Sequence, residues 1–406
     1  MKIGIIRETK TPPDSRVCLP PSHCKRIMDG NATIEIIVQS SPSRCFKDEE
    51  YEALGISIQE DLNDCDILIG VKEVKMPSLI PNKTYFFFSH TIKKQAYNKG
   101  LLRYILANKI HLIDYETLTD GEGKRVIAFG RWAGIVGAHN GILTWGKRNA
   151  TFNLKAMNQC FDFDEAKSYY DKLNLKGLKI VLTGNGRVAC GSQEVLDLMK
   201  IKQLSAREFL GFDGQEAVYC MLATEEIFAK GADATFDMEF YKNPVGYHSL
   251  MTPFLAKGNL LINGIYWDNK APALFNKEDM KKSTFNIEVI ADITCDIAPV
   301  ASIPSTLIAS TIADPIFGYD PITEEEVAPF QKHAVDMMTV DNLPNELPRD
   351  ASADFGNQFI AYVLPELLES KNNMIYRASI TTEKGELNAP FLYLADYVAS
   401  GGVENL

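Results

Sequence analysis

Short apolar runs alternate with helix-like segments through the first 135 or so residues of the chain. The runs are rich in β-branched and aromatic residues and predict strands at residues 3–8, 34–39, 66–73, 84–90 and 110–116. A helical pattern extends from Pro21 to Asp29. Several runs are continuously apolar and end in charged residues, as parallel strands buried on both faces do. This part of the chain is therefore predicted to form one α/β layered domain.

A second alternation of strands and helices follows. Small residues and then a helical pattern at 129–148 predict a long helix that leads into a second domain. Later apolar runs predict the strands of that domain, at residues 179–184, 217–226, 258–267 and 287–296. Two further helical patterns, at 353–370 and 391–400, lie near the end of the chain. The expected fold class is therefore α/β.

Composition narrows the classes of protein. The chain has 406 residues, of which 46 % are hydrophobic and 23 % are charged, which is ordinary for two globular domains. Its net charge of −11 argues against a nucleic-acid binder and against binding to anionic membranes, because both need a basic surface. No apolar run approaches the length of about 20 residues that spans a bilayer.

The N-terminal sequence and the cysteines bear on the compartment. MKIGIIRETK lacks the features of a signal peptide. The eight cysteines include no CxxC pair, so they are interpreted as reduced thiols and not as metal ligands. A cytoplasmic protein without a metal site is expected, and the redox role of Cys190 is left open.

A strand, a glycine turn and a helix follow one another at residues 179–200. The turn GNGRVA, residues 184–189, fits the dinucleotide pattern GxGxxG/A. Gly184 permits the tight turn, Gly186 lets backbone N–H groups approach a pyrophosphate, and Ala189 lets the helix pack closely on the sheet. Because both flanking elements are present, the turn predicts a dinucleotide site and not a purely structural turn.

The acidic residue that bonds the ribose 2′-OH is expected at the end of the next strand, about 20 residues on. The next strand-like run, 217–226, lies further away and has no acidic residue at its obvious end. Glu225 and Glu226 follow, but they also fit the first turn of a helix. The pattern therefore leaves NAD and NADP open as cofactors.

Charged residues follow two of the apolar runs in the first domain. Lys72 and Glu73 follow DILIGV, and His90 follows YFFFS. Taken singly, they fit the end of a strand and a structural loop histidine. Taken together, they indicate a crevice at the carboxyl ends of the strands. Further charged residues at strand or loop ends support this interpretation: Arg16, Glu116 and Arg125.

Such a crevice suits a substrate that carries several carboxylates and an amine. Burial and neighbouring cations would lower the pKa of Lys72 into the range of a general base. The remaining histidines lie in no recognisable constellation and are predicted to be structural: His23, His111, His139, His248 and His333. The metalloprotease pattern HExxH and the serine-hydrolase pattern GxSxG are both absent.

These segments together resemble the lysine-forming saccharopine dehydrogenases. They are also similar to the lysine–ketoglutarate reductase half of animal aminoadipic semialdehyde synthase and, more distantly, to alanine dehydrogenase. The similarity covers most of the chain and is weakest at about 150–175 and 200–250. It is carried by residues 7–21, 69–73, 89–95, 114–130, 262–267 and 340–352.

The resemblance implies two Rossmann-like domains with parallel sheets around a deep cleft. Residues 1–135, completed by residues 350–406, would form the substrate domain. Residues 136–349 would form the dinucleotide-binding domain. Two departures from the fungal enzymes bear on the cofactor, since the animal reductase half favours NADPH, and on the accepted amino acid. The glycine turn is closer to the animal reductase half, and Arg131-Trp132 stand where fungal enzymes have two aromatics.

The resemblance also implies a role for each site residue. Lys72 would take the proton of the substrate amine, and His90 would act as the acid–base group for water addition and carbinolamine collapse. The substrate-binding positions are Arg16, Glu73, Lys93, Gln95, Glu116, Lys124, Arg125 and Phe129. The cofactor-binding positions are Gly184, Gly186, Arg187, Val188, Ala189, Tyr266, Asp292, Asp341, Asn342, Leu343 and Pro344.

The implied reaction oxidises saccharopine at its secondary amine, with hydride transfer to NAD or NADP, and hydrolyses the imine to lysine and 2-oxoglutarate. An alanine dehydrogenase-like enzyme, or another opine or amino-acid dehydrogenase, is an alternative because each chemistry passes through an imine. A non-enzymatic dinucleotide-sensing protein is a third interpretation, and the charged set around Lys72 and His90 argues against it. The expected partner is a small amino-acid substrate of a monomer or small homo-oligomer, and the physiological direction stays open.

Overall fold

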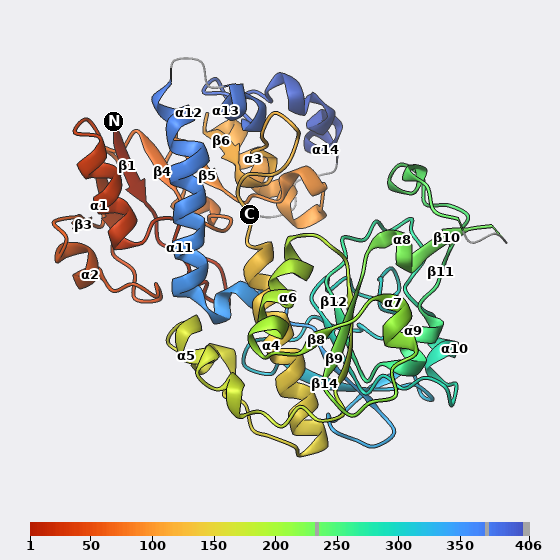
Figure 1. The fold of residues 1–406 in the computed structure, drawn as a ribbon. Coiled ribbons are helices and arrows are strands. Elements are labelled where there is room, and N and C mark those ends of the chain that lie inside the picture. Colours follow the sequence, from red (N-terminus) through yellow and green to blue (C-terminus); the bar gives the residue numbers. More distant parts are fainter. Residues whose placement is uncertain (232–234, 370–372, 401–406) are drawn as a thin grey trace. The chain divides into compact units, whose positions relative to one another are not determined.

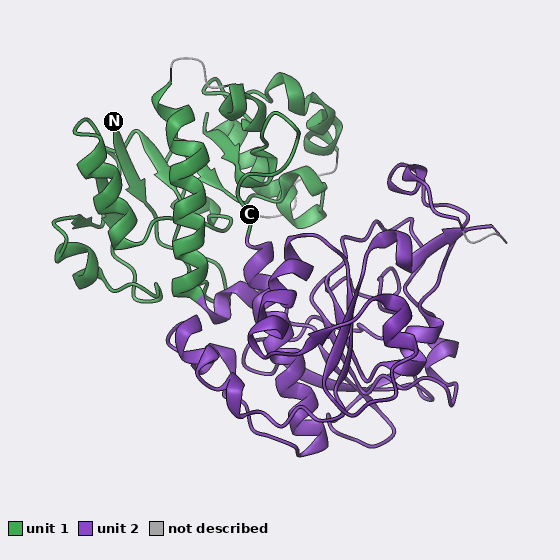
Figure 2. Ribbon diagram, viewed as in Figure 1, with its two compact units in different colours: residues 1–128, 348–406 green, residues 129–347 purple. Residues whose placement is uncertain are grey.

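The computed structural model describes residues 1–231, 235–369 and 373–400 (Figure 1). By its internal contacts the chain divides into two compact units (Figure 2). Unit 1 contains Met1–Ala128 and Pro348–Leu406, and unit 2 contains Phe129–Leu347. Each unit has its own sheet with surrounding helices, so the expected α/β fold class is confirmed.

Unit 1 is built on a six-stranded sheet in which all neighbouring strands are parallel. In sheet order the strands are β3 Ser57–Gln59, β2 Glu35–Gln39, β1 Lys2–Ile5, β4 Ile67–Ile69, β5 Thr84–Phe87 and β6 His111–Asp114. Every residue of β4 is buried, and so are the last three residues of β1, β5 and β6. This is the burial expected for parallel strands that are covered on both faces.

The C-terminal part of the chain belongs to unit 1. The helix α11 Pro348–Gln358 packs on α1 Pro21–Gly30. The single helix expected at 353–370 is instead α11, a π-helical turn Phe359–Val363 and α12 Leu364–Leu368. Pro365 explains the interruption, because it has no N–H for the regular helical bond and its ring crowds the preceding turn.

The other helices of unit 1 are short. They are α2 Asp48–Glu52, α3 Lys99–Ala107, α13 Asn373–Ala378 and α14 Ala395–Ala399. The helix expected at 391–400 forms in two parts, because a 3-10 helix Ala389–Leu394 precedes α14. Residues 401–406, which the expected substrate domain included, lie outside the described residues.

Unit 2 is built on an eight-stranded mixed sheet. In sheet order the strands are β15 Glu325–Val327, β14 Ile316–Asp320, β16 Val335–Met338, β13 Val289–Asp292, β12 Leu260–Asn263, β7 Lys179–Thr183, β9 Val218–Leu222 and β8 Lys202–Gln203. The strands from β16 to β8 are parallel, and β14 is antiparallel to both of its neighbours. The chain passes from β7 to β9 on one side and later to β12 on the other, so the end of β7 is a topological switch point.

Two helices of unit 2 pack almost backbone to backbone. They are α4 Gly130–Asn149 and α6 Arg187–Leu198. A Cβ on Gly134 would lie 1.9 Å from the carbonyl oxygen of Val188, and a Cβ on Gly191 would lie 2.0 Å from that of Arg131. The small residues of 129–148 are therefore required by close helix packing.

The rest of unit 2 consists of short elements. They are α5 Phe163–Lys167, α7 Ala206–Leu210, α8 Thr224–Ile227, α9 Thr252–Lys257, α10 Lys277–Met280 and the antiparallel pair β10 Phe228–Lys230 and β11 Tyr247–Ser249. The strand expected at 217–226 ends at Leu222, and Glu225 and Glu226 lie in α8. Over the described ranges, no helix combines the length and the apolar character needed to cross a membrane. All eight cysteines are free thiols.

Candidate active site

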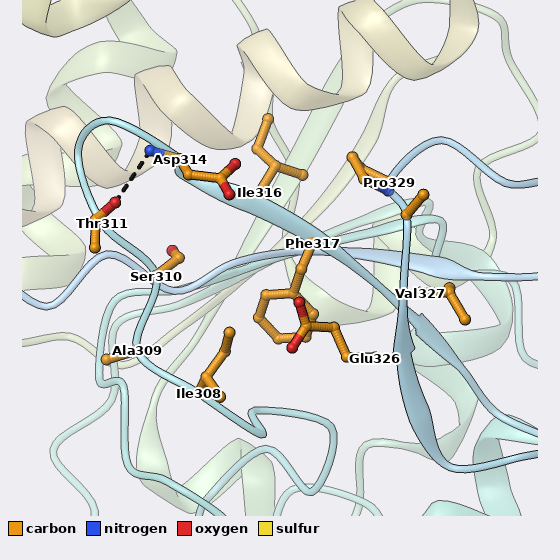
Figure 3. Close-up of a pocket in the computed structure, with 11 residues that line it drawn as sticks. Ile308, Ala309, Ser310, Thr311, Asp314, Ile316, Phe317, Glu326, Val327 and Pro329 are labelled. Carbon is orange, nitrogen blue, oxygen red and sulfur yellow. Dashed lines mark hydrogen bonds between the residues drawn. The ribbon is translucent and has the colours of Figure 1, made fainter.

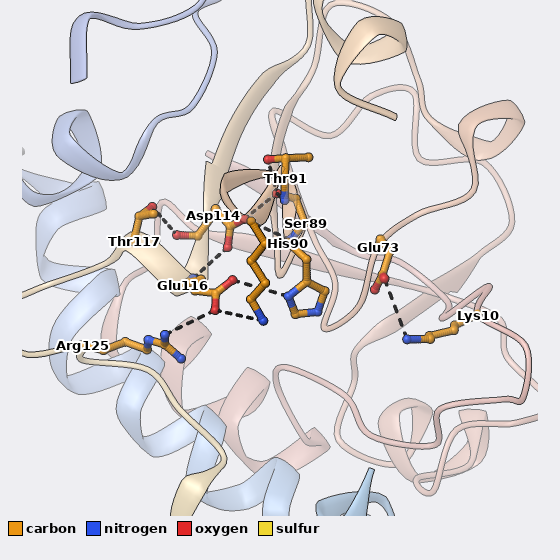
Figure 4. A network of polar contacts seen from close by, with 10 residues as sticks. Lys10, Glu73, Ser89, His90, Thr91, Asp114, Glu116, Thr117 and Arg125 are labelled. Carbon is orange, nitrogen blue, oxygen red and sulfur yellow. Dashed lines mark hydrogen bonds and ion pairs between the residues drawn. The ribbon is translucent and has the colours of Figure 1, made fainter. Parts of the chain in front are cut away.

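Three charged residues follow neighbouring strands at the carboxyl edge of the unit 1 sheet. Lys72 follows β4, His90 follows β5 and Glu116 follows β6. Because these strands are adjacent and parallel, their carboxyl ends lie side by side at one edge. Figure 4 shows polar side chains that gather there.

Glu116 is the centre of one group of charges. Its Oε2 lies 3.4 Å from Nδ1 of His90. Its Oε1 lies 3.6 Å from Nζ of Lys93 and 3.4 Å from Nη2 of Arg125 (Figure 4). Burial raises the pKa of Glu116, but the His90 hydrogen bond and the charges of Lys93 and Arg125 outweigh burial and lower it to about 2. Glu116 is therefore an anion, and its carboxylate lies beside Nδ1 of His90.

The loop that carries His90 is fixed from within the unit by Asp114. This carboxylate accepts hydrogen bonds from the backbone N–H groups of Ser89, at 3.0 Å, and of Glu116, at 2.7 Å. The Ser89 hydroxyl also donates to it, and burial raises the pKa of Asp114. His90 adopts a left-handed backbone with φ 55°, which is strained for a residue other than glycine. The Asp114 bonds thus hold both ends of the His90–Glu116 pair.

Lys72 has the properties of a base. Burial and the positive charges of Arg16 and Lys10 lower the pKa of Lys72 to about 8, which is the direction expected from the sequence. The neighbouring Glu73 has one oxygen, Oε2, that is buried and has no hydrogen-bond partner in the part of the chain that the structure describes. Its other oxygen lies 3.8 Å from Nζ of Lys10. An unsatisfied buried acceptor is costly, so Glu73 is suited to receive a donor from a ligand.

Glu8 is a functional candidate that the sequence reasoning missed. Its carboxylate accepts hydrogen bonds from the backbone N–H groups of Val71, at 2.6 Å, and of Lys72, at 2.9 Å. Burial is the main reason that the pKa of Glu8 is raised to about 7. Its only signal in the sequence is a glutamate shortly after the first strand, and nothing there indicates the segment that it contacts.

Arg16 is buried and pairs with a carboxylate of the same loop. It is 2 % exposed, and its guanidinium donates to both oxygens of Asp14, at 2.9 Å and 2.6 Å. Although burial opposes it, the charge and hydrogen bonds of Arg16 hold the pKa of Asp14 well below its usual range. The structure therefore shows Arg16 acting on Lys72 by its charge, while the predicted contact with a substrate carboxylate stays a prediction.

The remaining predicted substrate residues differ in their surroundings. Lys124 pairs with Glu122 at 3.1 Å, with both side chains at least 74 % exposed. Gln95 is exposed, and its backbone carbonyl accepts a hydrogen bond from Tyr397. Phe129 belongs to unit 2, where it precedes the first residue of α4. The structure thus brings Lys93, Arg125 and Glu116 together and leaves Lys124 at the surface.

The glycine turn of unit 2 has the geometry that the pattern predicts. Gly184 has φ +94°, and a Cβ there would lie 2.9 Å from the carbonyl oxygen of Gly264. Its N–H donates to the carbonyl of Leu222, which joins the turn to the end of β9. A Cβ on Gly186 would meet nothing within 4 Å, so open space lies in front of the N-terminus of α6. This arrangement fits a pyrophosphate bound by the first N–H groups of the helix.

The other residues of the turn have different surroundings. Ala189 is fully buried, and a Cβ on the facing Gly264 would lie 3.3 Å from its backbone nitrogen, which agrees with a packing role. Val188 also packs against Gly264, because its Cγ1 would lie 3.1 Å from a Cβ on that glycine. Arg187 is exposed at the first position of α6.

Asp292 belongs to a buried network that joins three strand ends. Its oxygens accept hydrogen bonds from Asn263 Nδ2, at 2.8 Å, and from the Thr306 hydroxyl, at 2.6 Å. Asn263 in turn accepts from the hydroxyl of Thr183, at 2.6 Å. Burial raises the pKa of Asp292 to about 6. Asp292 has no exposed surface and joins the ends of β7, β12 and β13, and its contact with a cofactor stays a prediction.

The last predicted cofactor positions differ in exposure. Tyr266 is 91 % exposed just beyond β12. Asp341 is exposed and Asn342 is half-buried. Leu343 and Pro344 are buried in the 3-10 helix Leu343–Glu346. The contact of these two residues with a cofactor stays a prediction.

A groove of about 590 Å³ lies elsewhere in unit 2, beside β14 and β15 (Figure 3). Ile308, Phe317 and Glu326 are among its lining residues. Four strands of the sheet separate β14 from β9, and two polar groups of the groove are already bonded within the protein.

Within the described ranges, no group of three or more His, Cys, Asp or Glu side chains is arranged to hold a metal ion.

Comparisons with known proteins give the family of the N-terminal part. Residues 4–136 match the family described as alanine dehydrogenase/PNT, N-terminal domain. Among solved structures, an L-alanine dehydrogenase has a TM-score of 0.67 at 15 % identity and covers 98 % of this chain and 100 % of that one. This likeness concerns the fold.

Curated relatives resemble the chain over most of its length. It is 29 % identical to the alpha-aminoadipic semialdehyde synthase of Arabidopsis thaliana and to the mitochondrial one of Bos taurus, over 97 % of the chain. The chain spans only 41 % and 47 % of the length of these two relatives. It is 27 % identical to the L-lysine-forming, NAD(+) saccharopine dehydrogenase of Yarrowia lipolytica, over 91 % of the chain and 92 % of that protein.

Proposed function

Because residues 4–136 belong to the alanine dehydrogenase/PNT N-terminal domain family, we propose that this protein is an NAD(P)-dependent oxidoreductase acting on a C–N bond of an amino acid. Within that class, the reaction is the interconversion of saccharopine with lysine and 2-oxoglutarate. The observation that carries the proposal is Lys72, a lysine of lowered pKa that follows β4, next to β5 and the His90–Glu116 pair. The similarity to saccharopine dehydrogenases over nearly the full length supports it.

The nicotinamide cofactor supplies the hydride acceptor when it is bound. Gly184 and Gly186 would hold its pyrophosphate at the N-terminus of α6, where a Cβ on Gly186 would meet nothing within 4 Å. The network of Asp292, Asn263 and Thr183 keeps the strand ends around that position rigid.

Lys72 removes the proton from the secondary amine of the substrate. A base needs a pKa near the working pH, and burial together with the charges of Arg16 and Lys10 brings the pKa of Lys72 to about 8. An appreciable fraction of the side chain is therefore neutral in mildly alkaline solution. The buried oxygen Oε2 of Glu73 is then available to accept a hydrogen bond from protonated Lys72 or from the substrate ammonium.

His90 serves the hydrolytic half of the reaction. Water adds to the imine carbon, and the resulting carbinolamine breaks its C–N bond, so a proton must leave the water and another must reach the departing amine. An imidazole whose Nδ1 is held by Glu116 transfers both protons through Nε2. Lys93 and Arg125, which lie beside Glu116, supply positive charge for the substrate carboxylates.

The end of β9 bears on the choice between NAD and NADP. Gly184 bonds to Leu222, so the residues after β9 lie next to the glycine turn. Glu226 there accepts a hydrogen bond from the backbone N–H of Ala223 at 2.9 Å, and Glu225 is exposed beside it. Two carboxylates at this place repel a 2′-phosphate and accept from a 2′-hydroxyl. The proposal is therefore that NAD(H) is the preferred cofactor.

The test follows the absorbance of the reduced nicotinamide with purified protein, lysine, 2-oxoglutarate and either NADH or NADPH. Oxidation that requires both lysine and 2-oxoglutarate, with NADH preferred, is the expected result. Oxidation with pyruvate and ammonia alone would instead indicate an alanine dehydrogenase-like enzyme. Cofactor binding without turnover in any of these reactions would contradict the proposed activity and favour a sensor.

A variant separates catalysis from folding. Lys72→Met should lower kcat by about 10²- to 10⁴-fold, which is the usual contribution of a general base. Its affinity for NADH, measured by fluorescence, should not change, because the cofactor residues lie in unit 2. Retention of full kcat in Lys72→Met would remove Lys72 from the mechanism.

A further inference from the structure

We propose that the C-terminal segment 389–400 holds the loop 90–98 in its working position, and that Tyr397 is the positioning residue of this contact. The loop carries His90 and Lys93, which both lie beside Glu116. The inference rests on the proposed function only where it concerns catalysis. The contact itself is a property of unit 1.

The backbone hydrogen bonds within the loop close single turns, such as those from the N–H of Lys93 to the His90 carbonyl and from the N–H of Asn98 to the Gln95 carbonyl, both at 3.1 Å. His90 and Lys94 both adopt left-handed backbones, with φ 55° and 54°. Two short 3-10 helices, Thr91–Lys93 and Ala96–Asn98, are its regular structure. Single turns of this kind are weak, and two left-handed residues other than glycine persist only where the surroundings impose them. An outside support is therefore needed beyond Asp114.

The C-terminal segment provides that support. Asp114 bonds Ser89, just before the loop, whereas the segment bonds Lys94 and Gln95 further along it. The Tyr397 hydroxyl donates to the backbone carbonyl of Gln95. Nζ of Lys94 donates to the carbonyl of Tyr393 at 3.0 Å and lies 5.1 Å from the centre of the Tyr393 ring. Two consecutive residues of the loop are thus bound to one segment about 300 positions later, at separations of 302 and 299.

The segment is itself firmly attached to α3. Its apolar residues recur every third position, at Phe391, Leu394 and Tyr397, and are buried in one cluster with residues of α3. Cations of α3 bond the last carbonyls: Lys99 Nζ donates to Ser400 at 2.8 Å, and Arg103 Nε donates to Val398 at 2.7 Å. Cations stabilise the carboxyl end of a helix such as α14, because the last carbonyls lack partners within the helix and carry partial negative charge. The support is therefore fixed independently of the loop.

Tyr397 is the point where this support acts on the site. The carbonyl of Gln95, which it bonds, also accepts the N–H of Asn98 at 3.1 Å and closes the second turn of the loop. Gln95 directly follows Lys94 and lies two positions after Lys93. Loss of the Tyr397 hydroxyl therefore allows the loop to move and takes Lys93 and His90 away from Glu116.

The experiment measures hydrogen exchange of backbone amides in Tyr397→Phe, which keeps the buried ring and removes one hydrogen bond. The amides of Lys93, Lys94 and Asn98 should exchange about fivefold faster, which is the factor expected for one lost hydrogen bond. Tyr362→Phe, at a tyrosine 51 % exposed in the same unit, is the matched control and should leave exchange unchanged. Exchange in the amides of β4 should stay unchanged in both variants.

Kinetics gives the second readout. In Tyr397→Phe, kcat for the condensation of lysine and 2-oxoglutarate should fall about threefold or more, while the Kd of NADH stays constant. Exchange that is unchanged in the loop, or that rises equally throughout unit 1, would overturn the inference. Exchange does not depend on turnover, so a wild-type protein without the proposed activity would contradict the proposed function and leave the inference to be decided by exchange.

Discussion

The carboxylate of Glu8 bonds the backbone N–H of Lys72 at 2.9 Å, and its second oxygen bonds the preceding N–H, that of Val71, at 2.6 Å. These two N–H groups come just after β4, where the strand ladder has ended. Glu8 thus fixes the backbone beyond the end of β4, up to Lys72, the residue that we propose as the base. The pair is separated by 64 positions in the sequence.

Glu8→Gln should lower kcat about tenfold, because an amide has only one oxygen to accept and places an NH₂ group against the other backbone N–H. NADH affinity should not change. Glu52→Gln, at an exposed glutamate of α2, is the control of equal chemistry. Equal kcat in the two variants would show that the bonds of Glu8 do not position Lys72.

The pH dependence of saccharopine oxidation should follow Lys72. The pKa of this lysine is lowered to about 8, and only the neutral amine is a base. The value of kcat/KM should therefore rise as pH increases towards 8 and level off above it. Lys10→Met removes a positive charge that lowers this pKa, so the rise should move to higher pH by about half a unit. Lys25→Met, at a half-buried position of α1, should leave the profile in place, and a shift in both variants would contradict the assignment.

Glu116→Gln should weaken catalysis, and it should lower stability above about pH 4.5 more than it does in acid. Its pKa is lowered to about 2 in the folded chain, so its ionised form adds stability above its unfolded pKa near 4.5, and this stability is lost as pH falls from about 4.5 to 2. Between pH 5 and pH 3, the Tm of the wild type, measured by calorimetry, should therefore fall by more than the Tm of Glu116→Gln. The variant should also show kcat reduced about tenfold or more, because the imidazole loses its anionic partner. An identical loss of Tm in the two proteins would contradict the pKa assignment.

Two glycines of the turn should respond differently to alanine. Gly184→Ala combines φ +94° with a Cβ only 2.9 Å from the Gly264 carbonyl, so it should lower the stability of unit 2 by about 1–3 kcal/mol. Gly186→Ala meets nothing within 4 Å and should keep the wild-type Tm. Its methyl group enters the space proposed for the pyrophosphate, so the Kd of NADH should rise about tenfold or more. Unchanged NADH binding in Gly186→Ala would argue against a pyrophosphate there.

Much of the framework was readable from local patterns. Continuous apolar runs ending in charge predicted β4, β5 and β6, and the structure has strands at each of these places. The glycine turn was equally readable, since a positive φ at Gly184 and a helix after Gly186 are requirements of a few neighbouring residues. Lys72 and His90 could be picked out because residues after parallel strands share one edge.

The structure alone decided which partners these residues have. Nothing local indicates that Glu8 bonds the segment of Lys72, that Arg16 is buried on Asp14, or that Asp292 is enclosed by Asn263. Periodicity likewise placed a helix near 391–400 but not its contact with the loop of His90.

The physical reason is the range of the interactions. Strand, turn and helix preferences arise from sterics and burial over a few residues, and the sequence by itself determines them. The charge and hydrogen-bond environment of Lys72, His90 and Glu116 depends on sheet order and on segments as far apart as Gln95 and Tyr397. Such contacts exist only once the chain has packed, and the pKa values follow from that packing and its burial.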